Sequence, residues 1–539
     1  MFQKHGMSGH SKKYLAVWIF SLKIIFPDAQ VSSGVLSFCG MNQRQLALIA
    51  GPLLFILIAA LPAPAGMPDT AKMTAAITAW IAVWWITEPV NLAVTSLLPL
   101  VLFPLAGVAP LKNVSGEYGN EIIFLFMAGF FFGKTIERWH LHRRIALRLV
   151  LWLGSDPSRT VLGFMVATGF ISMWISNTAT AVMMTPVAIA VAVQAKGDES
   201  NQRNFQRALL LGVGYACSIG GLATIIGTPT NAIFLSYVQQ KMSVEVSFWQ
   251  WFLFGFPFAM TLLLVCWVLL LRMFPLGKNT DMAQDSRASI RAELALLGSV
   301  TPPERRLMWL FGTVILAWVT GSLFWYNPLN EWIHTALAGQ PLPEDLDKIP
   351  NYCTDTVVAV AGAIFLFLTP AESDERGAPL LDWATALKIP WGIILLFGGG
   401  LALAKGFDHS GLAAWMGQQM EGLTALSHIL ILLVILSVVV VLSEVASNIA
   451  TASMMMPVLA ALAVSIGAHP FGLLLSATLA ASFGFGLPVA TAPNTIVFSS
   501  GFLTTRDMAR AGFLLDAVAI LLLLVFLYVL LPVVWGIRV

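Results

Sequence analysis

The sequence predicts an all-α polytopic membrane protein with two inverted-topology repeats, each containing a re-entrant hairpin and a discontinuous helix. The first observation is composition: 58% of the 539 residues are hydrophobic and 11% are charged, whereas soluble domains carry roughly 25% charged residues. The second is a series of apolar stretches near the ~20 residues that cross a bilayer. The third is a phrase, "ISNTATAVMMTPVAIAV" (175–191), that nearly recurs as "ASNIATASMMMPVLAAL" (446–462).

The apolar stretches set the expected organisation. They predict about 11 crossings plus 2 hairpins. We expect an N-terminal extension over 1–45, a first half with one repeat over 46–272, a cytoplasmic linker over 273–307, and a second half with the other repeat over 308–539. The apolar segments are 46–64, 73–88, 90–108, 121–137, 161–195, 207–238, 251–271, 308–328, 355–369, 390–405, 424–464, 471–499 and 513–536.

Charged loops predict the orientation in a cell (inner) membrane. Loops 138–159, 196–207 and 272–306 are basic, whereas 329–350 is acidic with a single lysine. Because Lys and Arg accumulate on the cytoplasmic side, the three basic loops are expected inside and 329–350 outside. The N-terminus is then expected in the cytoplasm and the C-terminus on the extracellular or periplasmic side. Loop 371–389 fits less well, because it is acidic yet expected inside.

Two apolar segments have the wrong length for a crossing. Segment 161–195 carries a polar triplet, Ser176–Thr178, at its centre, and each half of about 15 residues would span about 22 Å as a helix. That is too short for a ~30 Å hydrocarbon core. Both flanks are basic, so the segment is expected to enter and leave on the same side. Segment 424–464 repeats this design around Ser447–Ile449, which predicts two re-entrant hairpins.

The same order of motifs recurs in the two halves. The first hairpin aligns with the second when Ser172 is matched to Ser443, and "IIGTPTN" (225–231) then finds a counterpart in "PVATAPN" (488–494). Five crossings are expected between the hairpins, and an odd number places them on opposite faces. Inverted repeats whose broken helices meet near the membrane midplane are typical of secondary transporters.

The polar residues of these motifs are candidate ligands for a cation and an anion. One polar triplet could merely cap a helix, but two copies, each with a broken helix, favour binding. Freed carbonyls at Gly227 and Ala490 suit a small hard cation, and the amides of Asn177 and Asn448 can serve cation and carboxylate alike. Helix N-termini favour an anion. Neither tip holds Arg or Lys, so bound cations would balance the anion, and oxygen ligands without clustered carboxylates favour sodium.

Four motifs carry a family resemblance. The chain resembles the divalent anion/sodium symporter family, which moves di- and tricarboxylates or sulfate, through "SNTAT" (176–180), "GTPTN" (227–231), "SNIAT" (447–451) and "ATAPN" (490–494). Similarity runs from about residue 46 to the C-terminus. The resemblance implies a homodimer in the lipid bilayer, with a scaffold and a mobile transport domain in each protomer that works by an elevator motion. It implies co-transported sodium and no organic cofactor.

The resemblance also implies site residues. One sodium site is expected to use Ser172, Ser176, Asn177 and the Gly227 carbonyl, and the other Ser443, Ala446, Asn448 and the Ala490 carbonyl. The carboxylate substrate is expected to contact Ser176, Asn177, Thr178, Thr228, Pro229, Ser447, Asn448, Ile449 and Thr491. Ile449 stands where many bacterial relatives have threonine, so the identity of the transported anion stays open. Ala492 stands where a second proline is common.

Several alternatives remain open at this point. The first is a sodium-coupled importer of the C4-dicarboxylates succinate, malate or fumarate. The others are a sodium-independent di- or tricarboxylate exchanger, and a sodium-coupled citrate or sulfate transporter of the same fold. A nucleic-acid partner is not expected, because there is no basic tract, and an enzyme is not expected, because paired catalytic residues and metal clusters are missing. Glu444 lies inside the second hairpin and could be a proton site, a neighbour of the sodium ligands, or a structural partner of nearby amides.

Overall fold

A computed structural model describes residues 43–154, 156–194, 198–242, 244–276, 290–343, 349–372, 377–420 and 427–538. Within these ranges the protein is helical, and extended pairing is limited to an isolated bridge between Pro370 and Pro379. Eight of the described helices are long and apolar enough to cross a membrane. Most of the predicted N-terminal extension, and 277–289 of the predicted linker, lie outside the described residues. The predicted all-α membrane fold is confirmed.

The chain up to the first hairpin forms two long helices, a cluster of short ones, and a third long helix that turns into an amphipathic one. Residues 90–108, predicted as one crossing, instead form two short helices. Pro99 and Pro104 each lack an amide donor. Between the two short helices, the Tyr118 hydroxyl donates a hydrogen bond of 2.5 Å to the Ser96 carbonyl. The elements are α2 (Gln43–Ala60), α3 (Asp69–Thr87), α4 (Leu92–Thr95), α5 (Leu98–Leu105), α6 (Leu111–Gly116), η2 (Glu117–Gly119), α7 (Glu121–Arg138) and α8 (Leu141–Leu153).

The next five helices contain the first predicted hairpin and broken helix. The hairpin is interrupted at 173–176, so Asn177 and Thr178 belong to the first turn of the following helix rather than to the turn itself. The broken helix is interrupted at 222–228, next to Pro229. The elements are α9 (Pro157–Ser172), α10 (Asn177–Gln194), α11 (Glu199–Gly221), α12 (Pro229–Met242) and α13 (Phe248–Met273).

The middle of the chain forms a bent helical arm and then returns to the body of the molecule. The predicted crossing 308–328 continues through two π-helical turns to Leu337, because α15, η3, α16 and η4 follow one another without a loop. The elements are α15 (Pro302–Thr320), η3 (Gly321–Trp325), α16 (Tyr326–Trp332), η4 (Ile333–Leu337), α17 (Asp355–Leu368), α18 (Trp383–Ala386), α19 (Trp391–His409) and α20 (Leu412–Gln419).

The C-terminal helices repeat the series of hairpin, broken helix and long helix. The second hairpin is interrupted at Ala446 and Ser447, so Asn448 and Ile449 again start a helix. The broken helix is interrupted over 481–491. Whether the two series are inverted in the membrane stays a prediction. The elements are α21 (His428–Val445), α22 (Asn448–Ser465), α23 (Pro470–Ala480), α24 (Ala492–Phe498) and α25 (Thr505–Trp535).

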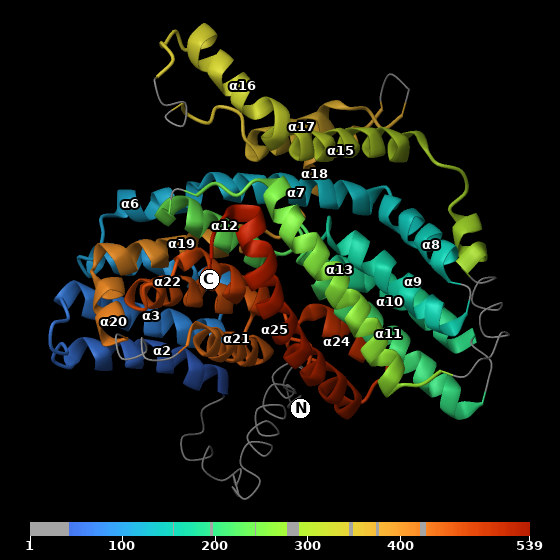
Figure 1. Ribbon diagram of the computed structural model, residues 1–539, viewed down its shortest axis with the longest axis horizontal. Coiled ribbons are helices and arrows are strands. Elements are labelled where there is room, and N and C mark those ends of the chain that lie inside the picture. Colours follow the sequence, from blue (N-terminus) through green and yellow to red (C-terminus); the bar gives the residue numbers. More distant parts are fainter. Residues whose placement is uncertain are drawn as a thin grey trace, which may run out of the picture.

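The two series pack against each other inside one body. Figure 1 shows α15, α16 and α17 along one edge beside α7, while α13, α24 and α25 lie between α8–α11 on one side and α2, α3 and α20 on the other. α10 and α11 of the first series contact α24 of the second, and α12 contacts α22 and α23. The largest hydrophobic cluster includes both hairpins and both broken helices. This packing brings together motifs from opposite halves of the chain.

Candidate functional site

The first hairpin brings three oxygens together, one of which is the Ser172 hydroxyl. This hydroxyl lies 2.7 Å from Asn177 Oδ1 and 2.7 Å from the Cys217 carbonyl. Three oxygens therefore share the single proton of a hydroxyl, and Ser172 itself is fully buried. A cluster with more oxygen acceptors than hydrogens suits a small cation, because oxygens are the ligands of hard cations.

Around this cluster, backbone and side-chain atoms of different segments approach one another closely at two glycines. A methyl group added to Gly221 would lie 2.8 Å from Asn177 Oδ1 and 3.2 Å from the Gly227 carbonyl oxygen. A methyl group added to Gly227 would lie 2.5 Å from the Gly221 carbonyl. Glycine at both positions therefore lets the Asn177 amide, the end of α11 and the Gly227 carbonyl converge. The structure brings Ser172, Asn177 and Gly227 of the predicted first sodium site together.

The second hairpin repeats the cluster. The Ser443 hydroxyl lies 2.8 Å from Asn448 Oδ1 and 2.5 Å from the Ala481 carbonyl. Ser443 is fully buried, as its counterpart in the first half is. A methyl group added to Gly484 would lie 3.2 Å from the Ala490 side chain and 3.4 Å from the Ser443 carbonyl. Ser443, Asn448 and Ala490 of the predicted second site therefore also lie together, and Ala446 adjoins them in the turn.

Two asparagines, Asn231 and Asn494, end the matching motifs "IIGTPTN" (225–231) and "PVATAPN" (488–494) of the broken helices. Asn231 Nδ2 donates to the carbonyls of Gly221 at 3.2 Å and Thr224 at 2.8 Å. Asn494 Nδ2 donates in the same way to Gly484 at 2.9 Å and Leu487 at 3.0 Å. Both amide groups therefore hold the interrupted backbone in place. Their Oδ1 atoms are buried and receive no hydrogen bond from the described residues, which leaves an acceptor beside each cluster.

A cavity of about 1040 Å³ lies between the two clusters. Both hairpin tips and both interruptions line it, so polar residues from the two halves of the chain face one cavity. Three of the longer helices, α10, α12 and α22, begin at this cavity. Their N-termini carry partial positive charge that favours an anion. The lining contains Ser176, Asn177, Thr178, Gly227, Thr228, Pro229, Ala446, Ser447, Asn448, Ile449, Ala490 and Thr491.

The cap hydroxyls differ between the halves. Ser176 Oγ accepts a hydrogen bond from the Ala179 amide at 3.2 Å, so it caps α10. Ser447, at the corresponding position, makes no capping bond. Thr491 Oγ accepts from the Asn494 amide at 3.3 Å and caps α24. Capping therefore accounts for Ser176 and Thr491, but it does not account for Ser447.

A family model described as the sodium:sulfate symporter transmembrane region matches residues 42–536. The chain belongs to this family. It is the divalent anion/sodium symporter family that the four motifs indicated. The match covers both hairpins and both interrupted helices, and together with the apolar helices it makes the protein a multi-pass membrane protein.

Individual relatives agree with this assignment. The chain is 39% identical over 505 residues to the sodium-dependent dicarboxylate transporter SdcS of Staphylococcus saprophyticus, covering 92% of this chain and 93% of the relative. It is 39% identical over 524 residues to the SdcS protein of Staphylococcus aureus strain USA300, covering 95% and 97%. Among solved structures, the Alcanivorax borkumensis YdaH transporter is similar in fold, with a TM-score of 0.52, 13% identity, and coverage of 90% of this chain and 98% of that one.

The cavity of this family member also has charged residues that the sequence analysis did not select. Lys134 and Glu137 of α7 line it and form an ion pair with an N–O distance of 2.5 Å. Arg44 and Glu88 line it as well, at the start of α2 and just after α3. Lys134 stands in an otherwise apolar run, and an ionisable residue inside a membrane segment is a functional signal that could have identified it.

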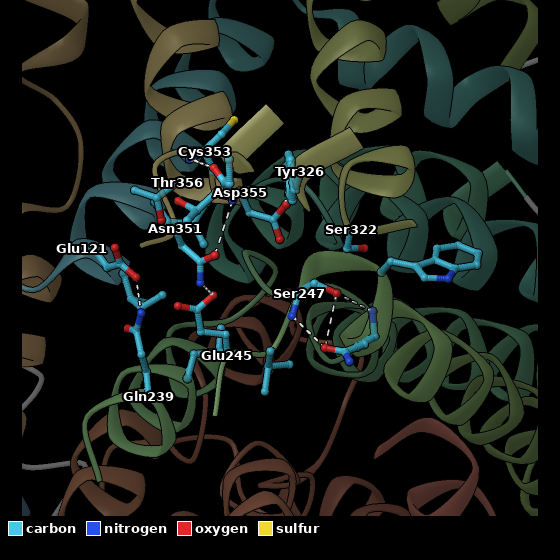
Figure 2. A pocket seen from close by; sticks show the side chains of 18 of the residues that line it. Glu121, Gln239, Glu245, Ser247, Ser322, Tyr326, Asn351, Cys353, Asp355 and Thr356 are labelled. Carbon is cyan, nitrogen blue, oxygen red and sulfur yellow. Dashed lines mark hydrogen bonds between the residues drawn. The ribbon is translucent and has the colours of Figure 1, made fainter. Parts of the chain in front are cut away.

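A second, smaller cavity of about 330 Å³ lies between α13, α16 and the start of α17 (Figure 2). Its carboxylates are engaged: Glu245 accepts from Asn351 Nδ2 at 2.6 Å, and Asp355 accepts from the Tyr326 hydroxyl and the Phe248 amide, each at 2.6 Å. Among the described residues no group of three His, Cys, Asp or Glu side chains could hold a metal ion here. The polar groups of this cavity therefore join the start of α13 to α16 and α17.

Proposed function

We propose that the protein imports C4-dicarboxylates such as succinate, malate and fumarate, driven by co-transported sodium ions. The observation that carries the proposal is the pair of oxygen-rich clusters, around Ser172 and Ser443, that flank one cavity at which three helices begin. The two SdcS relatives are named sodium-dependent dicarboxylate transporters, which supports this choice of ion and substrate.

The coupling follows from charge. Neither hairpin tip contains Lys or Arg, and Lys134, which lines the same cavity, is paired with Glu137. A doubly charged anion at the tips therefore needs another source of positive charge. Sodium ions at the two clusters supply it, together with the helix N-termini. We assign one ion to Ser172, Ser176, Asn177 and Gly227, and the other to Ser443, Ala446, Asn448 and Ala490. The substrate carboxylates contact the two tips, with Thr228, Pro229, Ile449 and Thr491 beside them.

The residues that line the cavity support an inward-open state. They include Glu137, near the end of α7 and next to the basic loop 138–159. Charge bias in this loop favours the cytoplasmic side for that helix end. We infer that the substrate leaves toward the cytoplasm from this state. Alternating access by an elevator motion, within a homodimer, completes the proposed mechanism.

The test is uptake of labelled succinate into proteoliposomes. An inward sodium gradient should drive accumulation, and removal of sodium should abolish it. Citrate and sulfate are added as competitors, because Ile449 replaces a hydroxyl at one tip. Uptake that ignores sodium but requires internal carboxylate would identify an exchanger and overturn sodium coupling. Strong inhibition by sulfate or citrate with none by malate would overturn the assigned substrate class.

A further inference from the structure

The stretch that carries the chain from α12 into α13 is bound to three other parts of the molecule. These parts are the start of α7 with the turn before it, the end of α19, and the start of α17 with the residues before it. Three of the hydrogen bonds measure 2.6, 2.6 and 2.7 Å, and Figure 2 shows Gln239 beside Glu121 and Glu245 beside Asn351. The α12–α13 contacts join Gln239 to Glu121, Gln240 to Glu117, Lys241 to Asp408, Glu245 to Asn351, and the Phe248 amide to Asp355.

The α12–α13 contacts lie at the far end of helices that start or finish at the transport cavity. α12 begins at the cavity with Pro229 and reaches Lys241 after roughly 18 Å of helix. α7 runs the other way, from Glu121 among the contacts to Glu137 at the cavity, over roughly 24 Å. The contacts also adjoin the acidic loop 329–350, whose charge favours the outer side of the membrane. The cavity and the contacts are therefore on opposite faces.

The matching connection in the second half makes local bonds instead. α13 and α25 each follow a broken helix and begin with a capping box, so the connection 499–504 between α24 and α25 corresponds to the one between α12 and α13. Within the described residues, the side-chain hydrogen bonds of this connection reach at most three positions along the chain. Ser499 donates to the Ile496 carbonyl, Ser500 to the Val497 carbonyl, and Thr504 to the Asp507 carboxylate.

A repeated pair of charges is also used differently on the two faces. In the register that aligns the two hairpins, Lys134 and Glu137 of α7 correspond to Lys405 and Asp408 of α19. At the cavity, Lys134 and Glu137 pair with each other at 2.5 Å. On the other face, Asp408 pairs with Lys241 of α12. The repeated acid therefore binds within its own helix where the protein is open, and binds another helix where the protein is closed.

We propose that the α12–α13 contacts form a latch that holds the outer face closed while the cavity is open to the cytoplasm, with Lys241 and Asp408 as its charged pair. α12 directly follows the interruption that carries Gly227 and Thr228, so it moves with the proposed ion and substrate sites. For the cavity to open outward, α12 must separate from α7 and α19 at this end, and the latch must break. The latch rests on the proposed alternating access and adds the contacts that set how often the outer face opens.

The experiment measures how often the outer face opens. Ala492 lines the cavity and is exposed there, so Ala492→Cys serves as the reporter. Cells that carry the full-length protein are treated from outside with a membrane-impermeant maleimide, and the labelling of the chain without the reporter is subtracted. We expect slow labelling of the reporter chain, because the latch keeps the cavity closed to the outside.

Removal of the charged pair should speed this labelling. Lys241→Met and Asp408→Asn should each raise the labelling rate about 2- to 5-fold, the effect expected for loss of a partly exposed ion pair. The two changes together should give no more than either alone, because both remove the same contact. Lys72→Met is the matched control: Lys72 is 16% exposed, close to the 18% of Lys241, but it pairs with Asp69 of its own helix. Labelling in this control should stay at the parent rate.

Several results would overturn the latch. They are an unchanged labelling rate in Lys241→Met, an equal increase in Lys72→Met, and additive effects of Lys241→Met and Asp408→Asn. Rapid labelling of the parent reporter chain would also overturn it, because the cavity would then face outward with the contacts intact. The readout involves neither sodium nor uptake, so a failure of the proposed transport function would be seen separately.

A second measurement uses the unaltered chain and does not depend on the folding of a variant. A water-soluble carbodiimide joins a lysine amine to a carboxylate when the two groups are in contact. Mass spectrometry of the treated membranes should therefore detect a covalent link between Lys241 and Asp408. Absence of this link would show that the pair does not form in the membrane, and the proposal would fail.

Discussion

Gly221→Ala should weaken sodium binding at the first cluster without unfolding the protein. The added methyl would lie 2.8 Å from Asn177 Oδ1 and 3.2 Å from the Gly227 carbonyl. To restore an ordinary contact of 3.4 Å, the amide must move by about 0.6 Å. Overpacking of this size costs about 1–3 kcal/mol. If that cost falls on the sodium-bound state, sodium affinity drops roughly 5- to 150-fold.

The assay is the sodium dependence of succinate uptake in proteoliposomes, with size-exclusion chromatography to check the fold. Gly312→Ala is the matched control: Gly312 also lies in a helix, and a methyl group there meets nothing within 4 Å. We expect a rightward shift of the sodium curve in Gly221→Ala alone. Wild-type sodium dependence in that variant would show that Asn177 and Gly227 do not bind the ion, and the reasoning would fail.

Three further predictions test other parts of the structure. Asn177→Ala and Asn448→Ala should each abolish sodium-driven uptake while leaving folded protein, and wild-type rates in either would contradict the site. Arg144→Met should lower stability by about 3–5 kcal/mol, because it leaves the buried Glu304 carboxylate without its ion pair at 2.8 Å; an unchanged melting temperature in detergent would count against this. Burial lowers the pKa of His142 in α8, so acidification below about 6.5, where the unfolded chain takes up this proton more readily, should destabilise the protein. His142→Asn should flatten that part of the pH–stability curve, and an equal slope in both proteins would refute the assignment.

Local signals in the sequence predicted the interruptions well. The polar residues Ser176 and Ser447, and the prolines Pro229 and Pro493, mark places where a helix cannot continue unchanged, and helices do break beside each of them. The prediction was off by one or two residues at the tips. Asn177, for example, starts a helix, because the Ser176 hydroxyl and not the asparagine amide supplies the N-terminal cap.

Features that depend on distant partners were missed. The break inside 90–108 is accompanied by the local signal of Pro99 and Pro104, but it also involves packing of Ser96 against Tyr118 and Gly399, which no local pattern reveals. Glu444 was noticed as an intramembrane carboxylate, but the amides of Gly486 and Leu487, from which it accepts hydrogen bonds, lie 42 and 43 residues further along the chain, in the second interruption. These contacts depend on how α21 packs against α23 and the interruption that follows it, and that packing is not encoded in either segment alone.

The sequence by itself determined the membrane class, the two hairpins, the two interrupted helices and the polar residues that they carry, because composition, apolar length and helix-breaking residues act over a few turns of chain. The tertiary structure decided which of these residues lie around one cavity. At a few glycines, two segments of the chain approach each other closely. Side-chain hydrogen bonds also join Ser172 to Asn177 and Ser443 to Asn448 across their turns. It also decided that the two halves differ, because the buried Glu444 accepts hydrogen bonds from the amides of Gly486 and Leu487 in the second half, whereas the corresponding residue of the first half is the apolar Met173.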